Sequence, residues 1–308
     1  MTTTTAEAVT APVQPRAIHW AGTGSLGIIW GTAFMGMAIA LEGFAPLWVA
    51  FGRLAFGAAA LLVIERVLRA AGIVRDSGPV PWRHVIAIGF FAAALPFTLL
   101  TWGLQTVPSA FAGVSMAAVA LFVLPLAHLF VPGERMTWPR VAGVSLGFAG
   151  VVVLIGPGAF TGAADADLLP GRLACVGAAL CYAISSILTR RCPPIDPIRL
   201  TLLMTAIGAA MLLPVALLAE GVPRAAPIGP LLTLAALGVL PTGIANLIRV
   251  LVIRSAGPGF MSLTAYQVPV WSVIFGALVL SEPIPASMLS ALALILGGIA
   301  MTRWRARR

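Results

Sequence analysis

The chain has 308 residues, of which 60% are hydrophobic and only 9% are charged. A soluble domain needs a polar exterior and cannot reach such values, so most of the surface must face lipid. The formal net charge is +9 and every basic residue is arginine. The arginines gather in short polar breaks between apolar runs, which favours a role in membrane topology over nucleic-acid binding.

A polar, Thr-rich tail covers residues 1–17 and lacks the apolar core of a cleaved signal peptide, so we expect the first helix to act as the insertion signal. The apolar runs that follow are long enough to cross a hydrocarbon core of roughly 30 Å. Ten of them are predicted as transmembrane helices: 18–40, 46–68, 83–105, 109–131, 135–156, 172–189, 197–218, 228–252, 258–280 and 284–302. The sequence therefore predicts an all-α integral membrane protein with almost no room for a soluble domain.

The arginines also predict the orientation of these helices. With the N-terminus inside, sixteen of the nineteen arginines fall in inside loops or at inside ends, and only Arg172 and Arg224 fall outside. Cytoplasmic loops of membrane proteins carry such an excess of positive residues. We therefore expect both termini in the cytoplasm, with the protein in a bacterial inner membrane.

Two stretches of the chain have the same design. Residues 109–156 and 257–302 each contain two apolar runs around a turn with a single glutamate, and these glutamates, Glu134 and Glu282, lie 148 residues apart. Ten helices in two copies give five per copy, and an odd number turns the second copy over in the membrane. We therefore predict inverted five-helix repeats at 18–156 and 172–308, the second with a basic cytoplasmic C-terminus, joined by an outside linker at 157–171.

Short motifs occur along nearly the whole chain, among them WGTAF at 30–34, GER at 133–135, GFAGV at 147–151, YQVPV at 266–270 and SEP at 281–283. In this order they resemble the motifs of EamA-type members of the drug/metabolite transporter superfamily. The resemblance implies ten transmembrane helices, inverted five-helix repeats, and carriage of amino acids, other metabolites or drug-like compounds, usually outward.

The chain departs from the family pattern in the fourth helix. The family usually has a proline about fourteen residues before the glutamate of this turn, where this chain has Ala120, and the proline of this helix is Pro125 instead. The ninth helix keeps Pro269. We therefore expect the break in the fourth helix to be shifted or lost.

Arg53 lies about seven residues inside the outer end of the second predicted span. A guanidinium stays protonated and is costly against lipid, so it must face a cavity or a partner. It either contacts an anion or carboxylate on a solute path, or makes structural bonds to backbone carbonyls or to Glu42. Because the resemblance places this arginine in proteins with many different substrates, the structural interpretation is favoured.

Polar and aromatic residues near the middle of the spans are candidates for a solute path. On the third helix, Thr98, either Thr101 or Trp102, and Gln105 have the spacing of one helix face. The path is predicted to include Thr98, Trp102, Gln105 and Arg53, together with Trp30, Met116, Tyr182, Asn246, Tyr266, Gln267 and Trp271. Each of the polar residues can instead join two helices by a hydrogen bond, but as a set they suit a cavity for an amphipathic organic solute.

Prolines within the spans are candidate hinges. Proline removes a backbone donor and clashes with the preceding helical turn. Pro96, Pro125, Pro241 and Pro269 are predicted to bend half-bundles during transport, with static kinks as the equal alternative. The spans contain no Asp or Glu near mid-membrane, which favours uniport or exchange over proton or sodium coupling.

These features favour a secondary transporter, most simply an exporter, that works by alternating access. An ATP-driven pump would need a phosphate-binding loop, a membrane-embedded enzyme would need clustered histidines or carboxylates, and a channel would need a polar stripe, and the sequence has none of these. We expect no catalytic residues, cofactor or metal. The expected partners are a small organic solute and the bilayer, without nucleic acid, for a monomer or homodimer.

Overall fold

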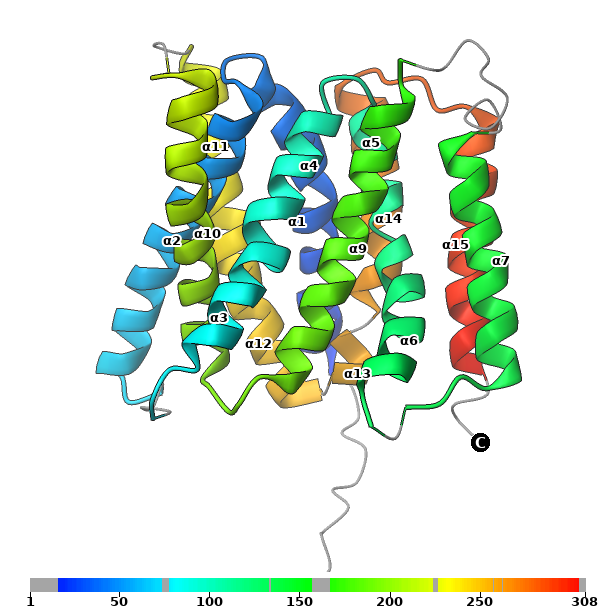
Figure 1. The fold of residues 1–308 in the computed structure, drawn as a ribbon, viewed down its shortest axis with the longest axis horizontal. Helices are drawn as coiled ribbons and strands as arrows, with labels where there is room; N and C mark the ends of the chain where they lie inside the picture. The colour runs from blue at the N-terminus through cyan, green and yellow to red at the C-terminus, as the bar shows by residue number, and fades with distance from the viewer. Residues whose placement is uncertain are drawn as a thin grey trace, which may run out of the picture.

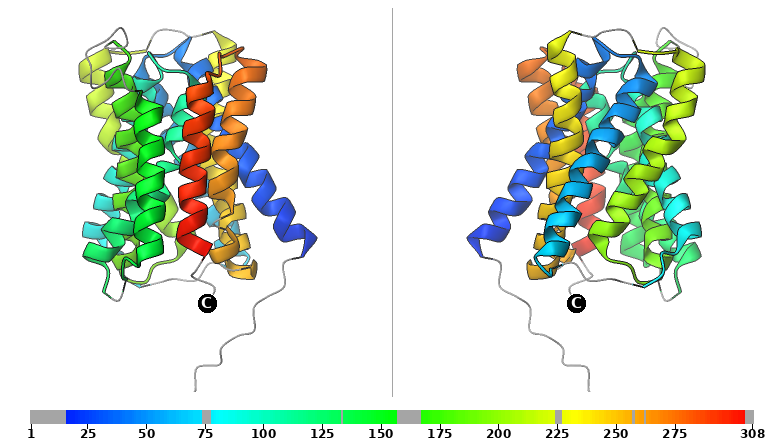
Figure 2. Two further views of the ribbon diagram at one scale, coloured as in Figure 1. Left: turned by 90° about the vertical axis from the view of Figure 1, so that its right-hand side faces the viewer. Right: turned by 90° about the vertical axis from the view of Figure 1, so that its left-hand side faces the viewer.

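The structure is a computed structural model that describes residues 16–73, 78–132, 134–156, 167–223, 227–256, 258–261 and 263–304. Within these residues every regular element is helical, and the helices form an upright bundle (Figure 1). The first and last helices begin and end at the same end of this bundle (Figure 2). We call the end that carries Ala17 and Trp304 the proximal end, and the opposite one the distal end.

The first half of the chain forms five helical stretches. These are α1 (Ala17–Leu41), α2 (Pro46–Ala70), a third stretch of α3 (Trp82–Gly89), η1 (Phe90–Ala94) and α4 (Leu95–Gly103), a fourth of α5 (Ser109–Ser115) and α6 (Ala118–Phe130), and α7 (Trp138–Ile155). The loops between them are short, so neighbouring stretches run in opposite directions. This agrees with the helices predicted from the apolar runs.

The second half forms five more. These are α9 (Leu169–Arg191), α10 (Pro197–Glu220), a third stretch of α11 (Ile228–Leu237), η2 (Gly238–Ile244) and α12 (Ala245–Ala256), a fourth of α13 (Pro258–Met261) and α14 (Thr264–Val279), and α15 (Ala286–Trp304). Eight stretches among the described residues are long and apolar enough to cross a membrane, whereas Thr264–Val279 and Ala286–Thr302 are shorter apolar helices.

Two π-helical segments, η1 and η2, interrupt the third stretch of each half. They begin at Phe90 and Gly238, 148 residues apart, which is the offset between Glu134 and Glu282. Pro96 lies in the first turn of α4 and Pro241 lies inside η2. Because proline cannot donate a backbone hydrogen bond, a locally wider turn accommodates it, and such π-bulges are frequent at functional sites.

The fourth stretch is broken at Met116 and Ala117, between α5 and α6. The break is therefore shifted rather than lost. Pro125 lies inside α6 and Pro269 lies inside α14, and neither proline ends its helix. In the second half, α13 ends at Met261 and α14 begins at Thr264. The fourth stretch is therefore interrupted in both halves.

Small residues allow close contact between α7 and α15, which lie side by side at one edge of the bundle (Figure 1). A Cβ on Gly143 would lie 2.6 Å from the carbonyl oxygen of Gly298, and one on Gly298 would lie 2.7 Å from the backbone nitrogen of Gly147. Glycine-lined interfaces of this kind are typical of helices that pack in lipid. Gly143 and Gly147 thus contact another helix of the same bundle.

Helices α5 and α14 pack closely at Gly113, where an added Cβ would overlap the side chain of Ser272. We expect Gly113→Ala to lower the free energy of unfolding by about 1–3 kcal/mol, because the two helices must separate to admit a methyl group. The matched control is Gly24→Ala in α1, where no atom lies within 4 Å of the added Cβ. This control should be neutral or stabilising. Denaturation of both variants in detergent checks the prediction, and equal stability of the two would contradict it.

Candidate functional site

Arg53 lies in the interior of the bundle, and its side chain is 6% exposed. Its Nη1 donates to the Met37 Sδ at 3.3 Å, and its Nε lies 3.5 Å from the Thr242 Oγ1. The guanidinium carbon lies 4.3 Å from the centroid of the Phe97 ring, in a cation–π arrangement. These neighbours come from α1, η2 and α4, so three separate stretches converge on Arg53.

Tyr182 of α9 completes this group. Its ring packs edge to face against Phe97, with the centroids 6.4 Å apart, and its phenol is close enough to Arg53 for electrostatic interaction. We call Arg53, Met37, Phe97, Thr242 and Tyr182 the Arg53 cluster. Arg53 and Tyr182 were predicted from the sequence as path residues, whereas the other three members were not. The cluster contains residues from both halves of the chain.

The contacts of Arg53 can be compared with its two predicted roles. Within the described part of the chain, neither Glu42 nor a backbone carbonyl accepts a hydrogen bond from its guanidinium, and the ion pairs found there involve other arginines. A thioether sulfur is a weak acceptor, and the bond to Thr242 is long. Arg53 is thus a buried cation with spare donors, and among the described residues it contacts the side chains of Met37, Thr242 and Phe97.

A cleft of about 420 Å³ opens near the distal ends of α2, α4 and α10. We call it the distal cleft, and its lining residues are Pro46, Leu47, Thr98, Trp102, Gln105 and Glu220. As their spacing predicts, Thr98, Trp102 and Gln105 face one space. The volume is in the range of small-molecule pockets.

Two glutamates at the distal end each hold the start of a helix in the other half. Glu220 accepts hydrogen bonds from the backbone nitrogens of Leu47 at 3.0 Å and Trp48 at 3.2 Å. The first turn of a helix has unpaired N–H groups and the positive end of the helix dipole, so a carboxylate is well placed there.

Glu282 forms the second of these contacts, to the nitrogens of Ser109 at 2.7 Å and Ala110 at 2.9 Å. Ser281 has a left-handed φ of 54°, and the Glu282 nitrogen bonds the Gly276 carbonyl, so the chain turns back over the end of α14. We call the Glu220 and Glu282 contacts the carboxylate clasps. Sequence reasoning missed the role of Glu220, whose only signal was its place at a helix end before Gly221.

The proximal end is held differently. Glu134 occupies the position in the first half that Glu282 occupies in the second. It pairs with Arg190 at 2.9 Å and with Arg140 at 3.5 Å. Asp196 accepts from the nitrogens of Ile198 and Arg199 in its own helix. In the described residues, carboxylates therefore cap helices across the two halves at the distal end, whereas the proximal carboxylates have ionic or local partners.

Several other predicted path residues pack between helices. The Trp30 Nε1 donates to the Pro241 carbonyl at 3.0 Å, which ties α1 to η2. Gln267 and Trp271 of α14 lie against Gly27 and Gly31 of α1, where an added Cβ would come within 2.7 Å and 2.5 Å of their side chains. The Trp30 bond joins two helices, and the contacts of Gln267 and Trp271 are packing contacts between α14 and α1.

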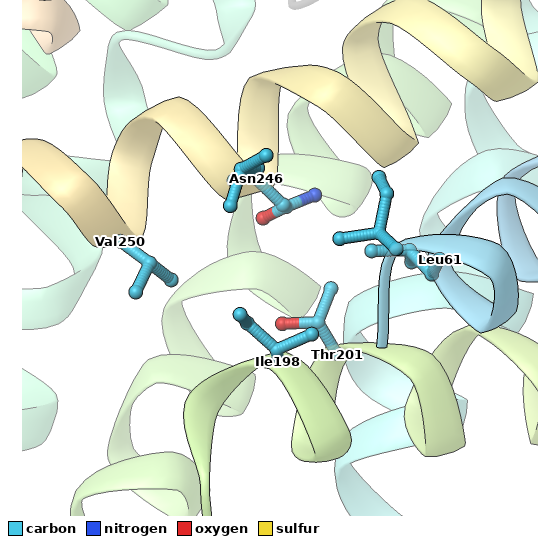
Figure 3. A pocket seen from close by; sticks show the side chains of 7 residues that line it. Leu61, Ile198, Thr201, Asn246 and Val250 are labelled. Atoms are coloured by element: carbon cyan, nitrogen blue, oxygen red, sulfur yellow. The ribbon is translucent and has the colours of Figure 1, made fainter. Parts of the chain in front are cut away.

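Asn246 adjoins the Arg53 cluster through the backbone of Thr242, whereas Met116 and Tyr266 belong to neither group. The Asn246 Nδ2 donates to the Thr242 carbonyl at 2.6 Å, and its side chain borders a narrow pocket with Leu61 and Thr201 (Figure 3). Met116 lies at the helix break, and Tyr266 packs, partly buried, against the main core. The structure therefore brings together Arg53 with Tyr182, and Thr98 with Trp102 and Gln105.

Within the described residues, no three His, Cys, Asp or Glu side chains lie close enough to hold a metal ion, and the three cysteines are free thiols. What remains is a helical bundle with apolar, membrane-length helices and a buried polar group between its halves. This is the architecture of a polytopic membrane transport protein.

The chain belongs to the EamA-like transporter family, whose sequence model matches residues 24–156 and again 169–304. It is 31% identical over 240 residues to the aromatic amino acid exporter YddG of Ancylobacter novellus, covering 77% of this chain and 79% of that one. It is 26% identical over 258 residues to the uncharacterized inner membrane transporter YedA of Escherichia coli K12, covering 82% and 79%. A crystal structure with 23% identity superposes with a TM-score of 0.64 over 94% of this chain and 99% of the other, which shows a shared fold.

Proposed function

We propose that this protein is a secondary transporter that exports small amphipathic organic solutes, amino acids among them, across a bacterial inner membrane. The observation that carries this proposal is the Arg53 cluster, in which a buried guanidinium with spare donors lies beside two aromatic rings. Such a group can bind the carboxylate of a solute while the rings contact its apolar part. A relative named as an aromatic amino acid exporter supports this chemistry.

The mechanism we propose is alternating access between two inverted repeats, 18–156 and 172–308. The common offset of η1 and η2 and the broken fourth stretch of each half support the duplication. In transporters of this kind, the substrate site lies between the repeats and is exposed to each side in turn. Pro96 and Pro241 at the π-helical segments are better placed as hinges than Pro125 and Pro269, which lie within continuous helices.

The arginine distribution supports a cytoplasmic proximal end and termini, so the distal cleft faces outward. Its tryptophan and amide side chains suit the exit of an amphipathic solute. The path then runs from the cytoplasm, past the Arg53 cluster, to the distal cleft. We propose no cofactor, and either a monomer or a homodimer as the working unit.

Flux of L-phenylalanine into proteoliposomes tests this function, and we expect it to saturate and to be stimulated by phenylalanine on the opposite side. Trp102→Ala should lower the maximal flux severalfold, because it removes an aromatic wall of the distal cleft. Trp138→Ala is the control, since Trp138 is 85% exposed at the start of α7. Linear flux without trans-stimulation would indicate a channel, and equal flux in both variants would remove the distal cleft from the path.

A further inference from the structure

We propose that Glu220 makes the distal cleft a binding site for the ammonium group of an amphipathic amine. This inference deepens the proposed transport function and rests on it only for the direction of solute movement. It assigns a second polar contact, separate from Arg53, to solutes that carry both a carboxylate and an amine.

Glu220 has unused acceptor capacity toward the cleft. Each of its oxygens accepts one backbone N–H, from Leu47 or from Trp48. A carboxylate offers about four acceptor positions, so each oxygen keeps one. The side chain is half-buried and lines the cleft itself, which leaves these positions accessible to a ligand.

The other walls of the cleft favour a cation with an apolar part. The Trp102 side chain is 48% exposed, and an exposed indole face attracts an ammonium group. Gln105 and Thr98 add neutral polar groups, while Pro46 and Leu47 are apolar. No basic residue is among the described residues that line the cleft, so nothing there competes with an incoming amine for the carboxylate.

Glu282 makes a clasp without lining the cleft, so a clasp is not by itself the proposed amine site. It makes the same pair of bonds to backbone nitrogens, but it does not line the cleft. A Cβ on Gly276 would lie 2.5 Å from its Oε2, so this carboxylate packs against α14. The two half-buried glutamates therefore form a matched pair that shares the clasp, and of the two only Glu220 lines the cleft.

Titration calorimetry of the full-length protein in detergent with phenethylamine and with 2-phenylethanol tests the proposal. These probes differ in the ammonium group and share the phenethyl part. We expect Glu220→Gln to weaken phenethylamine binding about tenfold or more, because a charge-assisted hydrogen bond is lost, and to leave 2-phenylethanol binding unchanged. Glu282→Gln should leave the ratio of the two affinities at its wild-type value.

Equal weakening of both probes by Glu220→Gln, or the same change of ratio in Glu282→Gln, would overturn the proposal. Trp102→Leu provides a variant that keeps both clasps, and it should also lower the ratio, since it removes the cation–π contact. If the Glu220→Gln protein does not fold, Trp102→Leu decides the test. A ratio of phenethylamine to 2-phenylethanol affinity that Trp102→Leu leaves unchanged would then count against the site. Amine binding that depends on Glu220 in a protein without saturable flux would support the site and refute the transport function.

Discussion

Replacing Arg53 with methionine is expected to abolish saturable flux of carboxylate solutes while leaving the protein at least as stable as the wild type. The guanidinium is buried and, among the described residues, has no anionic partner. Replacing buried charges with apolar side chains of similar size is often neutral or stabilising by about 1–4 kcal/mol. Met37 and Phe97 provide an apolar surround for the new side chain. Transport should fall at least about tenfold, since the contact to the solute carboxylate is lost.

Thermal unfolding in detergent and counterflow in proteoliposomes measure the two effects separately. The control is Arg69→Met in the same helix, because Arg69 pairs with the buried Glu65, whose carboxylate would lose this partner. This variant should lose stability and keep its flux per folded molecule. If Arg53→Met instead unfolds the protein, the structural interpretation of Arg53 is correct.

The helices and the face shared by Thr98, Trp102 and Gln105 follow from local patterns in the sequence. Length and apolar content fix a span, and helical spacing fixes which side chains lie together. The same kind of reasoning found the 148-residue offset. It recurs between η1 and η2, although their π-helical form was not predicted from the prolines.

The Arg53 cluster and the carboxylate clasps depend on contacts between segments that are distant in sequence. Met37, Phe97 and Thr242 look like ordinary core residues until folding places them around Arg53. The break at Met116 likewise has no proline or glycine of its own, and it follows the stretch of α5 that packs against α14 at Gly113. A single sequence contains no information on which helix end a glutamate such as Glu220 will cap.

Removal of both carboxylate clasps is expected to open the distal end. Each glutamate bonds two backbone nitrogens that otherwise lack partners, and net contributions of about 1.5–3 kcal/mol are typical for hydrogen bonds to charged groups. Since every 1.4 kcal/mol changes an equilibrium about tenfold, losing both clasps should raise the population of the open state by roughly a hundredfold or more.

A cysteine at position 107 reports this opening. Val107 is 5% exposed and lies against Gly171 of α9, so it is buried between the two halves at the distal end. In a chain with the three native cysteines replaced by alanine, we expect Glu220→Ala with Glu282→Ala to increase the rate at which Val107→Cys reacts with a membrane-impermeant maleimide about a hundredfold. The matched control is Glu134→Ala, which removes the corresponding glutamate at the proximal end and should leave this rate unchanged. A rate that rises equally in the control would mean that losing any of these carboxylates loosens the whole bundle, whereas a rise confined to the distal pair would show that the clasps hold one end of the path closed.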